Sequence, residues 1–399
     1  MELKVQKYFR RRQMKKILIY GYYGLLNAGD DYIMLSVLNT LKNMVGKDSI
    51  TILSASDDYR ELKLNDNVHI KILPANRWIR SWVILKEVIK NNYFIIGGGG
   101  LWPNDSWKKV FVHLMWISIG RLLGTHCILY GIELTFVRND LTKKIWRKII
   151  QKTDWIITRN RKSKELLNDI SVSNKVKAYS DITFSITDSE INDFRNSTLS
   201  NKIETRYIIW ALAMPWSEDE LQKNHYIKRY EALVSALVEL SMELDKKYPS
   251  VTHLFIPFYQ KNDVKLAHDI ISMRKQFNAY LYKEHWLDIR PLFAHAEFAV
   301  CMRFHSVLFA LYEMCDFVAI SYSPKTTDLL EEIGCPLYTE FGIREKSYFY
   351  KEIDLDINEY INKMQQLDFW KNKKIAAKEQ LVQKGIMASQ ILKGWIEDE

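Results

Sequence analysis

The chain has little of what marks disulfide-rich, zinc-binding or membrane-spanning proteins. Its 399 residues include four cysteines, which lie far apart and without the paired spacing of a metal site: Cys127, Cys301, Cys315 and Cys335. Cys301 and Cys315 lie inside apolar runs, so we expect buried thiols, no disulfide framework and a reducing compartment. The most apolar stretch, 110–137, is interrupted by histidines and charged residues, which argues against a spanning helix.

Several common catalytic motifs are also missing. The chain has no Gly-x-Gly-x-x-Gly opening and no Gly-Lys-Ser/Thr run, so neither a dinucleotide fingerprint nor a P-loop is supported. It has no His-Glu-x-x-His pair for zinc and no Gly-x-Ser-x-Gly elbow of a serine hydrolase. The start of the chain has no continuous apolar core of the kind that a signal peptide requires, so we expect a cytoplasmic protein.

The amino-acid composition indicates a basic globular protein. Hydrophobic residues make up 47% of the chain, the net charge is +9 and the isoelectric point is about 9.0. Such a charge suits nucleic acid, an acidic membrane surface or a small anionic substrate. No basic-aromatic module accompanies it, so nucleic acid is not an expected partner. The basic segment from Lys4 to Lys16 could touch a membrane, although a solvated leader is the simpler interpretation.

Apolar runs of strand length alternate with helical patterns in both halves of the chain, which predicts parallel sheets with crossover helices. A polar stretch, 188–205, breaks the alternation and is the expected linker. We therefore predict an α/β protein with two Rossmann-like, doubly wound domains, 16–195 and 206–375, facing a cleft. A basic leader, 1–15, precedes them and a helix, 376–399, follows.

The expected strands can be placed by their apolar runs. They lie at 16–20, 50–54, 70–73, 93–96, 126–130, 154–158, 207–211, 252–257, 279–281, 297–301 and 317–321. The expected helices lie at 32–44, 110–123, 162–168, 230–244, 263–273, 306–315 and 327–333, with a helical tail from 360 to 397.

Polar and glycine-rich segments follow five of these strands, at the point where each strand ends. They contain Asn27, Gly29 and Asp30 in the loop 21–30; Gly98, Gly99 and Gly100 in the run 97–100; Arg159; Arg303 with His305; and Tyr322, Ser323 and Lys325. The carboxyl ends of parallel strands share one edge of a sheet, so these groups can converge there. Three cations and a histidine at such an edge favour an anion site, to which helix N-termini add free N–H groups.

Each of these segments also has a purely structural interpretation. The glycine run 97–100 can simply permit a tight turn, because glycine adopts positive φ at little cost. Asp30 can cap a helix that begins near Tyr32. Arg159 can be a surface residue and Lys325 a solvated tip, and a lone histidine is more often structural than catalytic.

Seven short motifs occur in order along the chain. They are Gly-Tyr-Tyr-Gly-x-x-Asn-x-Gly-Asp at 21–30, the strand and glycine loop at 95–101, Thr-Arg-Asn-Arg-Lys-Ser at 158–163, Asp-Ile-Thr-Phe at 181–184, Met-Arg-Phe-His at 302–305, Ile-Ser-Tyr-Ser-Pro-Lys at 320–325 and Leu-Leu-Glu-Glu-Ile-Gly at 329–334. This ordered set resembles the polysaccharide pyruvyl transferase family over roughly residues 15 to 340. Two places depart from the family pattern: 130–135 lacks a Gly-Gln-Gly-x-Gly-Pro segment, and Asn160 stands where an acidic residue is usual.

The resemblance implies a two-domain fold like that of the B-type glycosyltransferases. It implies transfer of a pyruvyl group from phosphoenolpyruvate to a sugar of a cell-surface polysaccharide or its lipid-linked precursor, which forms a ketal and releases phosphate. Phosphoenolpyruvate is then a substrate, and neither a metal nor another cofactor is expected. His305 would be the general acid, while Arg159, Arg303 and Lys325 would hold the phosphate and carboxylate.

The other strand-end residues would bind substrates. Asn27, Gly29 and Asp30 are expected near the acceptor, and the same substrate-binding set includes Gly98, Gly99, Gly100, Tyr322 and Ser323. A lipid-linked acceptor would make the basic leader and the apolar helix 110–123 candidates for peripheral contact with the inner face of the membrane.

Two other functions stay open at this point. A glycosyltransferase of the same fold would use a nucleotide sugar and would need an acidic ribose contact, for which Glu297 or Asp328 could serve. A non-catalytic binding protein on this scaffold is the other alternative, although the joint presence of Arg303, His305 and Lys325 argues against it.

Overall fold

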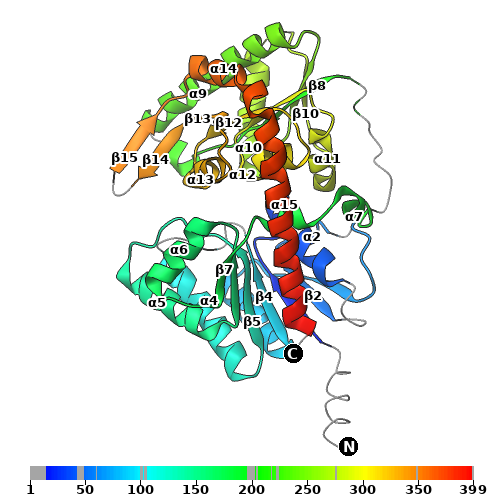
Figure 1. Ribbon diagram of the computed structural model, residues 1–399, viewed down its shortest axis with the longest axis vertical. Helices are drawn as coiled ribbons and strands as arrows, with labels where there is room; N and C mark the ends of the chain where they lie inside the picture. Colours follow the sequence, from blue (N-terminus) through cyan, green and yellow to red (C-terminus); the bar gives the residue numbers. More distant parts are fainter. Residues whose placement is uncertain are drawn as a thin grey trace, which may run out of the picture. The chain divides into compact units, whose positions relative to one another are not determined.

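The computed structural model divides into two compact units (Figure 1). Unit 1 comprises Met1–Leu25, Asp30–Thr198 and Leu381–Glu399, and unit 2 comprises Leu26–Gly29 and Leu199–Gln380. The structure describes residues 15–42, 49–59, 61–98, 102, 106–195, 203, 205–216, 218–221, 224–274, 276–346 and 349–397. Each unit is built on a parallel sheet, so the predicted doubly wound α/β architecture is confirmed. The cleft expected between the two domains stays a prediction.

Unit 1 contains a seven-stranded parallel sheet in the order β3-β2-β1-β4-β5-β6-β7. The strands are β1 (Ile17–Tyr20), β2 (Ile50–Ser54), β3 (Val68–Ile72), β4 (Tyr93–Gly97), β5 (His126–Ile132), β6 (Trp155–Thr158) and β7 (Val176–Ala178). Central strands such as β4 are buried on both faces, which is why they are continuous apolar runs rather than alternating ones. The strand order reverses between β1 and β4, and a sheet of this kind binds ligands at the carboxyl ends of the strands at that point.

Most helices of unit 1 connect successive strands of its sheet, and α7 (Asp188–Asn192) follows its last strand. They are α2 (Ala28–Leu41), α3 (Arg77–Lys90), α4 (Trp107–Leu122), α5 (Asp140–Lys152), α6 (Arg161–Ile170) and α7 (Asp188–Asn192), with a 3-10 turn η1 (Ile182–Ser185). The sequence did not lead us to expect α3 or α5. Helix α2 begins at Ala28 instead of Tyr32, so Gly29 and Asp30 belong to its first turn. Acidic residues are favourable there because they face the positive end of the helix dipole.

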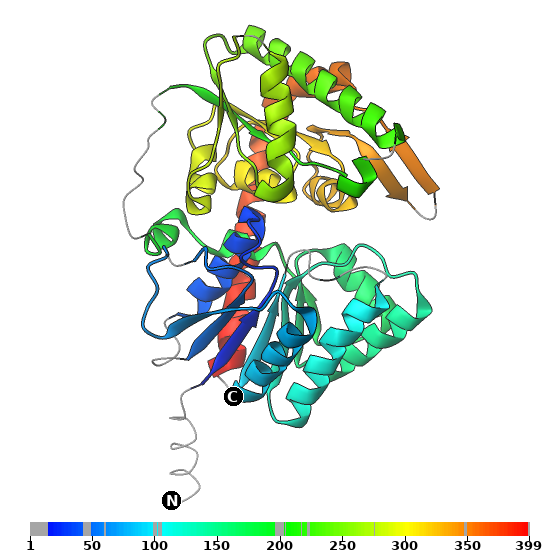
Figure 2. The same cartoon turned by 180° about the vertical axis from the view of Figure 1, so that it is seen from behind.

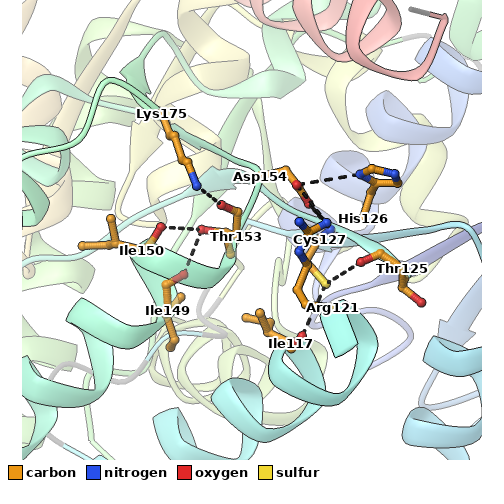
Figure 3. Close-up of polar contacts among 10 residues, drawn as sticks. All are labelled: Ile117, Arg121, Thr125, His126, Cys127, Ile149, Ile150, Thr153, Asp154 and Lys175. Atoms are coloured by element: carbon orange, nitrogen blue, oxygen red, sulfur yellow. Dashed lines mark hydrogen bonds and ion pairs between the residues drawn. The ribbon is translucent and has the colours of Figure 1, made fainter. Parts of the chain in front are cut away.

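Asp154 fixes the crossovers into β5 and β6 at the amino-terminal edge of the sheet (Figure 3). Its carboxylate accepts hydrogen bonds from the backbone N–H of Cys127 at 2.7 Å and from Nη1 of Arg121 at 2.9 Å. Nearby, Nζ of Lys175 donates to the carbonyl oxygen of Thr153 at 3.0 Å. Burial raises the pKa of the Cys127 thiol to about 12, and the Asp154 charge adds to the effect. Cys127 is therefore an inert packing residue. All four cysteines are buried free thiols, which confirms the burial expected for Cys301 and Cys315.

Unit 2 contains a six-stranded parallel sheet in the order β10-β9-β8-β11-β12-β13. The strands are β8 (Tyr207–Ala211), β9 (Thr252–Phe255), β10 (Ala279–Leu281), β11 (Phe298–Cys301), β12 (Phe317–Ser321) and β13 (Tyr338–Glu340). The order reverses between β8 and β11, which places the expected binding edge of this unit at the ends of those two strands.

The remaining elements of unit 2 are mainly helical. They are α8 (Glu218–Leu221), α9 (Asn224–Lys247), α10 (Gln260–Met273), η2 (Trp286–Asp288), α11 (Ile289–Phe293), α12 (Phe304–Tyr312), α13 (Pro324–Glu332) and α14 (Ile357–Met364), with an antiparallel pair β14 (Gly342–Lys346) and β15 (Phe349–Ile353). The helical patterns at 230–244, 263–273 and 306–315 correspond to α9, α10 and α12.

The long C-terminal helix α15 (Leu367–Glu397) belongs to unit 2 up to Gln380 and to unit 1 from Leu381. The prediction of a separate helix beginning at 376 is wrong, because α15 already begins at Leu367. Its early turns are anchored in unit 2, where Nζ of Lys374 donates to the carbonyl oxygen of Met314 at 3.1 Å. Its last turn packs in unit 1, where Trp395 stacks on Trp155 with ring centroids 4.5 Å apart.

No helix in the described part of the chain combines the length and the apolar character that crossing a bilayer requires.

Candidate functional site

The binding edge of unit 2 is organised around the carboxylate of Asp263, which is almost completely buried. Its Oδ1 accepts the backbone N–H of Met214 at 3.2 Å, and its Oδ2 accepts the backbone N–H of Tyr259 at 2.9 Å. Nε of Arg303 donates to Oδ2 at 2.9 Å and Nη2 donates to Oδ1. One side chain thereby joins the segments that follow β8, β9 and β11, at the point where the strand order reverses.

Arg303 stands at the N-cap of α12 and presents a fixed guanidinium. Besides its two-pronged pairing with Asp263, its Nη1 donates to the hydroxyl of Tyr322 at 3.2 Å. Burial by itself lowers the pKa of Arg303, but Tyr322 and the Asp263 carboxylate raise it more, so the pKa ends above its ordinary value. The guanidinium therefore stays charged and is held in one orientation, which suits planar recognition of a carboxylate or phosphate.

His305 lies in the first turn of α12, two residues after Arg303. Its ring packs edge-on against Phe304 at 5.3 Å between centroids and lies 6.4 Å from Phe309. Gly29 lies against the same imidazole: a Cβ built on Gly29 would be 2.0 Å from Nδ1 of His305. A glycine is required there because any side chain would occupy the position of the ring.

The segment Leu26–Gly29 is part of unit 2 because it pairs with the start of α10. The backbone N–H of Ala28 donates to the carbonyl oxygen of Phe258 at 2.9 Å, and the N–H of Gln260 donates to that of Leu26 at 3.1 Å. Asn27 forms an isolated antiparallel bridge with Tyr259. Thus Asn27 and Gly29, expected from the sequence near the acceptor, lie beside the Arg303 and His305 turn.

Gly29→Ala is expected to lower activity without loss of folding. Alanine normally stabilises a helix relative to glycine by about 1 kcal/mol, but here the methyl group must displace the His305 ring. A shift of about 1 Å in a reacting group can cost about 100-fold in rate. Steady-state kinetics and thermal unfolding together measure the two effects. Gly394→Ala in α15 is the matched control, since a Cβ there meets nothing within 4 Å; equal activity of the two variants would contradict the placement of His305.

The segment after β12 contributes a second helix N-terminus. Ser323 precedes α13, which begins with Pro324, and Lys325 lies half-buried in its first turn. The hydroxyls of Ser321 and Thr327 are 2.7 Å apart and hold this turn to the end of the strand. The positive ends of α12 and α13 therefore lie at the same sheet edge as Arg303 and Lys325, which favours an anion there.

The binding edge of unit 1 is formed by tightly packed glycines. A Cβ on Gly97 would be 1.9 Å from the hydroxyl of Tyr23, and one on Gly98 would be 2.0 Å from the carbonyl oxygen of Gly131. Both glycines thus permit close packing, which supports their structural interpretation. Gly99 and Gly100 lie outside the described residues, so their expected role in substrate binding stays a prediction.

Two adjacent carboxylates, Asp30 and Asp31, are buried in the first turns of α2. Asp30 does not cap the helix from outside, because α2 begins two residues before it. Asp31 accepts hydrogen bonds from the backbone N–H of Gly24 at 3.1 Å and from the hydroxyl of Tyr59. Burial raises the pKa of Asp31 to about 7 against the opposing effect of these hydrogen bonds, and the charge of Asp30 raises it further.

Asp31→Asn is expected to remove a pH dependence from stability. The folded pKa of about 7 exceeds the ordinary value of 3.8, so ionisation opposes folding and stability falls as the pH rises between these values. Asparagine keeps an oxygen acceptor for Gly24 and Tyr59 but carries no charge. The variant should therefore be more stable than the wild type above the folded pKa, by up to about 4 kcal/mol, and the two should converge in acid. Thermal unfolding across this range measures the difference, with Asp57→Asn as an exposed control; a difference independent of pH would contradict the argument.

Arg159 lies after β6 in unit 1, buried between two carboxylates. Nη1 donates to Asp181 at 3.1 Å and Nη2 donates to Glu133, while Nδ2 of Asn160 donates to the other oxygen of Glu133 at 3.0 Å. The interpretation of Arg159 as a surface residue is wrong, since its side chain is 2% exposed. Burial alone lowers the pKa of Arg159, but Glu133 and Asp181 raise it above the ordinary value.

The carboxylates around Arg159 count against a role in anion binding, because the three charges sum to minus one. Arg159 also belongs to unit 1, whereas Arg303, His305 and Lys325 belong to unit 2. Its convergence with those residues stays a prediction.

The carboxylates that hold both arginines in place were not expected from the sequence. Glu133 directly follows β5, and Asp263 lies in the first turn of the helix that follows β9. An acidic residue directly after a strand, or in the first turn of the helix after it, is the signal that could have found them. Glu297, one of the two acidic residues considered for a ribose contact, precedes β11. Its carboxylate accepts a hydrogen bond from Nε of Arg206 at 2.8 Å. It therefore lies at the opposite edge of the sheet, and that prediction is wrong.

The described residues include no group of three or more His, Cys, Asp or Glu side chains that could hold a metal ion.

A model of one protein family matches most of the chain. The family is described as polysaccharide pyruvyl transferase, and the match spans residues 27–324, from the Asn27 segment to the end of the Arg303 and Tyr322 cluster. The chain belongs to the polysaccharide pyruvyl transferase family. It is therefore a transferase of polysaccharide biosynthesis, for which a sugar acceptor is plausible. A search of curated proteins finds no match.

Solved structures with the same overall fold include several sugar-nucleotide enzymes. UDP-GlcNAc 2-epimerase from Neisseria meningitidis, bound to UDP-GlcNAc, matches with a TM-score of 0.60 and 12% identity, covering 97% of this chain and 100% of its own. HepE from Anabaena, in complex with UDP-glucose, matches with a TM-score of 0.54 and 11% identity, covering 97% and 100%. Trehalose-6-phosphate synthase OtsA matches with a TM-score of 0.56 and 9% identity, covering 96% and 98%. These similarities establish the glycosyltransferase-B type of fold.

Proposed function

We propose that the protein transfers a pyruvyl group from phosphoenolpyruvate to a sugar of a cell-surface polysaccharide or its lipid-linked precursor. The observation that carries this proposal is the turn at the start of α12, where a guanidinium fixed by Asp263 stands two residues from His305. Family membership supports a pyruvyl transfer, and the turn offers the two functions that such a reaction needs, anion binding and proton donation.

Arg303 and Lys325 are the proposed ligands of the phosphate and carboxylate of phosphoenolpyruvate. The bonds to Asp263 and Tyr322 use three of the five N–H groups of Arg303. Among the described residues this leaves one N–H group on each of the two terminal nitrogens of Arg303 to bind phosphoenolpyruvate. Because the Asp263 carboxylate offsets the charge of Arg303, the N-termini of α12 and α13 and the ammonium of Lys325 supply the remaining positive potential. Tyr322 and Ser323 border this position. The charge of Arg159 is offset by Glu133 and Asp181, so the proposal rests on Arg303 and Lys325, and a contribution of Arg159 from unit 1 stays a prediction.

His305 is the proposed general acid. A proton passes from its imidazolium to the methylene carbon of phosphoenolpyruvate, which becomes a methyl group as the adjacent carbon gains oxocarbenium character. A sugar hydroxyl adds to that carbon. The bond between the same carbon and the phosphate oxygen then breaks, and a second sugar hydroxyl adds to the carbon and closes the ketal. The two protons lost by the hydroxyls balance those gained by the methyl group and the phosphate. No metal or further cofactor enters this scheme.

Asn27 and Gly29 are the proposed acceptor-side residues of unit 2, and Asp30 and Gly98 those of unit 1. We place the reaction in the cytoplasm, where phosphoenolpyruvate is formed.

The test supplies the protein with carbon-labelled phosphoenolpyruvate and a panel of sugars in free, nucleotide-linked and lipid-linked form. Transfer is read by mass spectrometry as a gain in sugar mass equal to one pyruvic acid minus one water, and phosphate release is measured in parallel. The proposal requires that phosphate release depends on an acceptor. A parallel arm supplies labelled UDP-glucose and UDP-GlcNAc; sugar transfer in that arm with no pyruvyl transfer in the first would overturn the proposal, and Asp328 would then be the remaining candidate for a ribose contact.

A further inference from the structure

The outer faces of α3 and α4 in unit 1 expose large apolar side chains that the proposed reaction does not use. On α3, Trp78 is 81% exposed and Trp82 is 71% exposed, with Ile79 and Ile89 on the same side of the helix. On α4 the exposed apolar residues are Trp107, Phe111 and Leu122. Scattered apolar residues on a surface are ordinary. Two adjacent helices that expose three tryptophans instead form an apolar patch of the kind that marks an interaction site.

The two helices form one surface. Nε1 of Trp116 on α4 donates to the hydroxyl of Ser81 on α3 at 3.2 Å, and a Cβ on Gly120 would be 2.7 Å from Cγ1 of Val88. Figure 2 shows both helices on the near face of the sheet of unit 1. Trp78 and Trp82 are four residues apart, and Phe111, Met115 and Leu122 have the spacing of one stripe, so each helix presents a continuous outer face.

This surface is strongly basic. The sequences of α3 and α4 contain seven Lys or Arg residues and one acidic residue, Glu87. Glu87 is itself buried and paired with Lys71 at 2.7 Å and Lys90 at 3.6 Å. Arg77, Lys86, Lys108 and Lys109 are exposed among the aromatic side chains. The outer faces of the two helices therefore carry positive charge beside tryptophan.

We propose that the α3 and α4 surface docks the protein on a bilayer that contains anionic lipids. Tryptophan is favoured at the boundary between headgroups and acyl chains, and clustered lysine and arginine are attracted to anionic headgroups. A protein partner fits less well, because the cores of protein interfaces are depleted of lysine. The exposed faces of α3 and α4 carry no acidic residue, so their positive charge is complementary to anionic lipid headgroups.

The α3 and α4 surface lies close to the binding edge of unit 1, so membrane docking would affect access to that edge. Helices α3 and α4 begin after the carboxyl ends of β3 and β4, so Trp78 and Trp107 lie at the same sheet edge as the loop Gly21–Gly24. A bilayer at this patch would bring a lipid-linked sugar to the binding edge of unit 1. The docking itself does not depend on the proposed reaction, and its test requires no turnover.

The test measures sedimentation of the full chain with vesicles of phosphatidylcholine alone and of phosphatidylcholine mixed with phosphatidylglycerol. Binding is expected only with the anionic vesicles, and added salt should weaken it. Trp82→Ser should lower the partition coefficient about tenfold. Lys86→Glu should lower it by tenfold or more, since each basic residue near an anionic surface contributes roughly a factor of five.

The matched controls lie on α15 in unit 2. Phe369, which is 72% exposed, is changed to serine to match Trp82, and the exposed Lys371 is changed to glutamate to match Lys86. Neither control should alter binding. Equal losses in the control variants, binding that survives in Trp82→Ser, or no binding to anionic vesicles would overturn the proposal. Analytical ultracentrifugation tests a second copy of the chain as the alternative occupant of the surface. If the protein does not bind vesicles but forms a dimer that Trp82→Ser abolishes, the surface is a dimer interface and the membrane proposal is overturned.

Discussion

The His305→Gln variant is expected to keep its fold and its affinity for phosphoenolpyruvate while its turnover falls about 10²- to 10⁴-fold, the usual contribution of a positioned general acid. Glutamine preserves the approximate length of the side chain and its contact with Gly29, but it has no proton to give at neutral pH. Steady-state kinetics should therefore show the loss in kcat with little change in KM. The variant should also lose the part of the pH–rate profile that reports the acid.

His268→Gln is the matched control, because His268 is an exposed histidine on α10 of the same unit. Its activity should equal that of the wild type. A His305→Gln protein with wild-type turnover would remove the proposed acid, and a fall in donor affinity with unchanged turnover would make His305 a binding residue instead.

The Asp263→Asn variant is expected to lose both stability and activity. The amide offers one acceptor where the carboxylate offers two, and its NH₂ group then faces a donor, either Arg303 or the backbone N–H of Met214 or Tyr259. Removing one partner of a buried ion pair costs 3–5 kcal/mol, and the partial exposure of Arg303 places the expected loss near the low end, at about 3 kcal/mol. For a unit of this size that lowers the melting temperature by on the order of 10 °C.

The activity of Asp263→Asn should fall more than its stability explains, since Arg303 is no longer held in one orientation. Assays well below the melting temperature separate the two effects. Asp269→Asn on the same helix is the control. Asp269 pairs with Lys265 at the surface, where such pairs contribute at most about 1 kcal/mol, and asparagine keeps an oxygen acceptor for the hydroxyl of Tyr230. Wild-type activity in Asp263→Asn would show that the orientation of Arg303 does not matter for the reaction.

A double-mutant cycle with Arg303→Gln measures the coupling directly. The double variant should be less destabilised than the sum of the two single variants, because neither charge is then left unpaired.

The comparison of the two arginines shows why strand-end position alone does not identify a ligand. Arg159 and Arg303 both follow apolar strands and are equivalent in the sequence pattern. In the folded units Arg303 shares one carboxylate and a tyrosine hydroxyl, whereas Arg159 is enclosed by Glu133 and Asp181. The number of carboxylates brought to each guanidinium depends on which strands are neighbours, and the local sequence around each arginine does not contain that information.

The sequence by itself determined the α/β class, the alternation of strands with helices and the placement of chemistry at strand ends. These follow from local physics: buried strands must be apolar, and helices show a period of 3.6. It also placed Arg303 and His305 in one turn, since they are two residues apart. Amphipathic α5 and the Trp-rich α3 were missed, the latter because its exposed aromatic residues hide the usual division into apolar and polar faces.

Only the tertiary structure decided which side chains contact Arg303 and His305. Strand order brings Asp263 after β9 to Arg303 after β11, although 40 positions separate them in the chain. The pairing of Leu26–Gly29 with the segment at the start of α10 places Gly29 against His305. Such contacts arise because non-adjacent segments meet at a switch point of the sheet, and hydrophobic periodicity reports only which face of each segment is buried. The residue types of the site can be recognised along the chain, but their orientation, charge balance and exposure are properties of the fold.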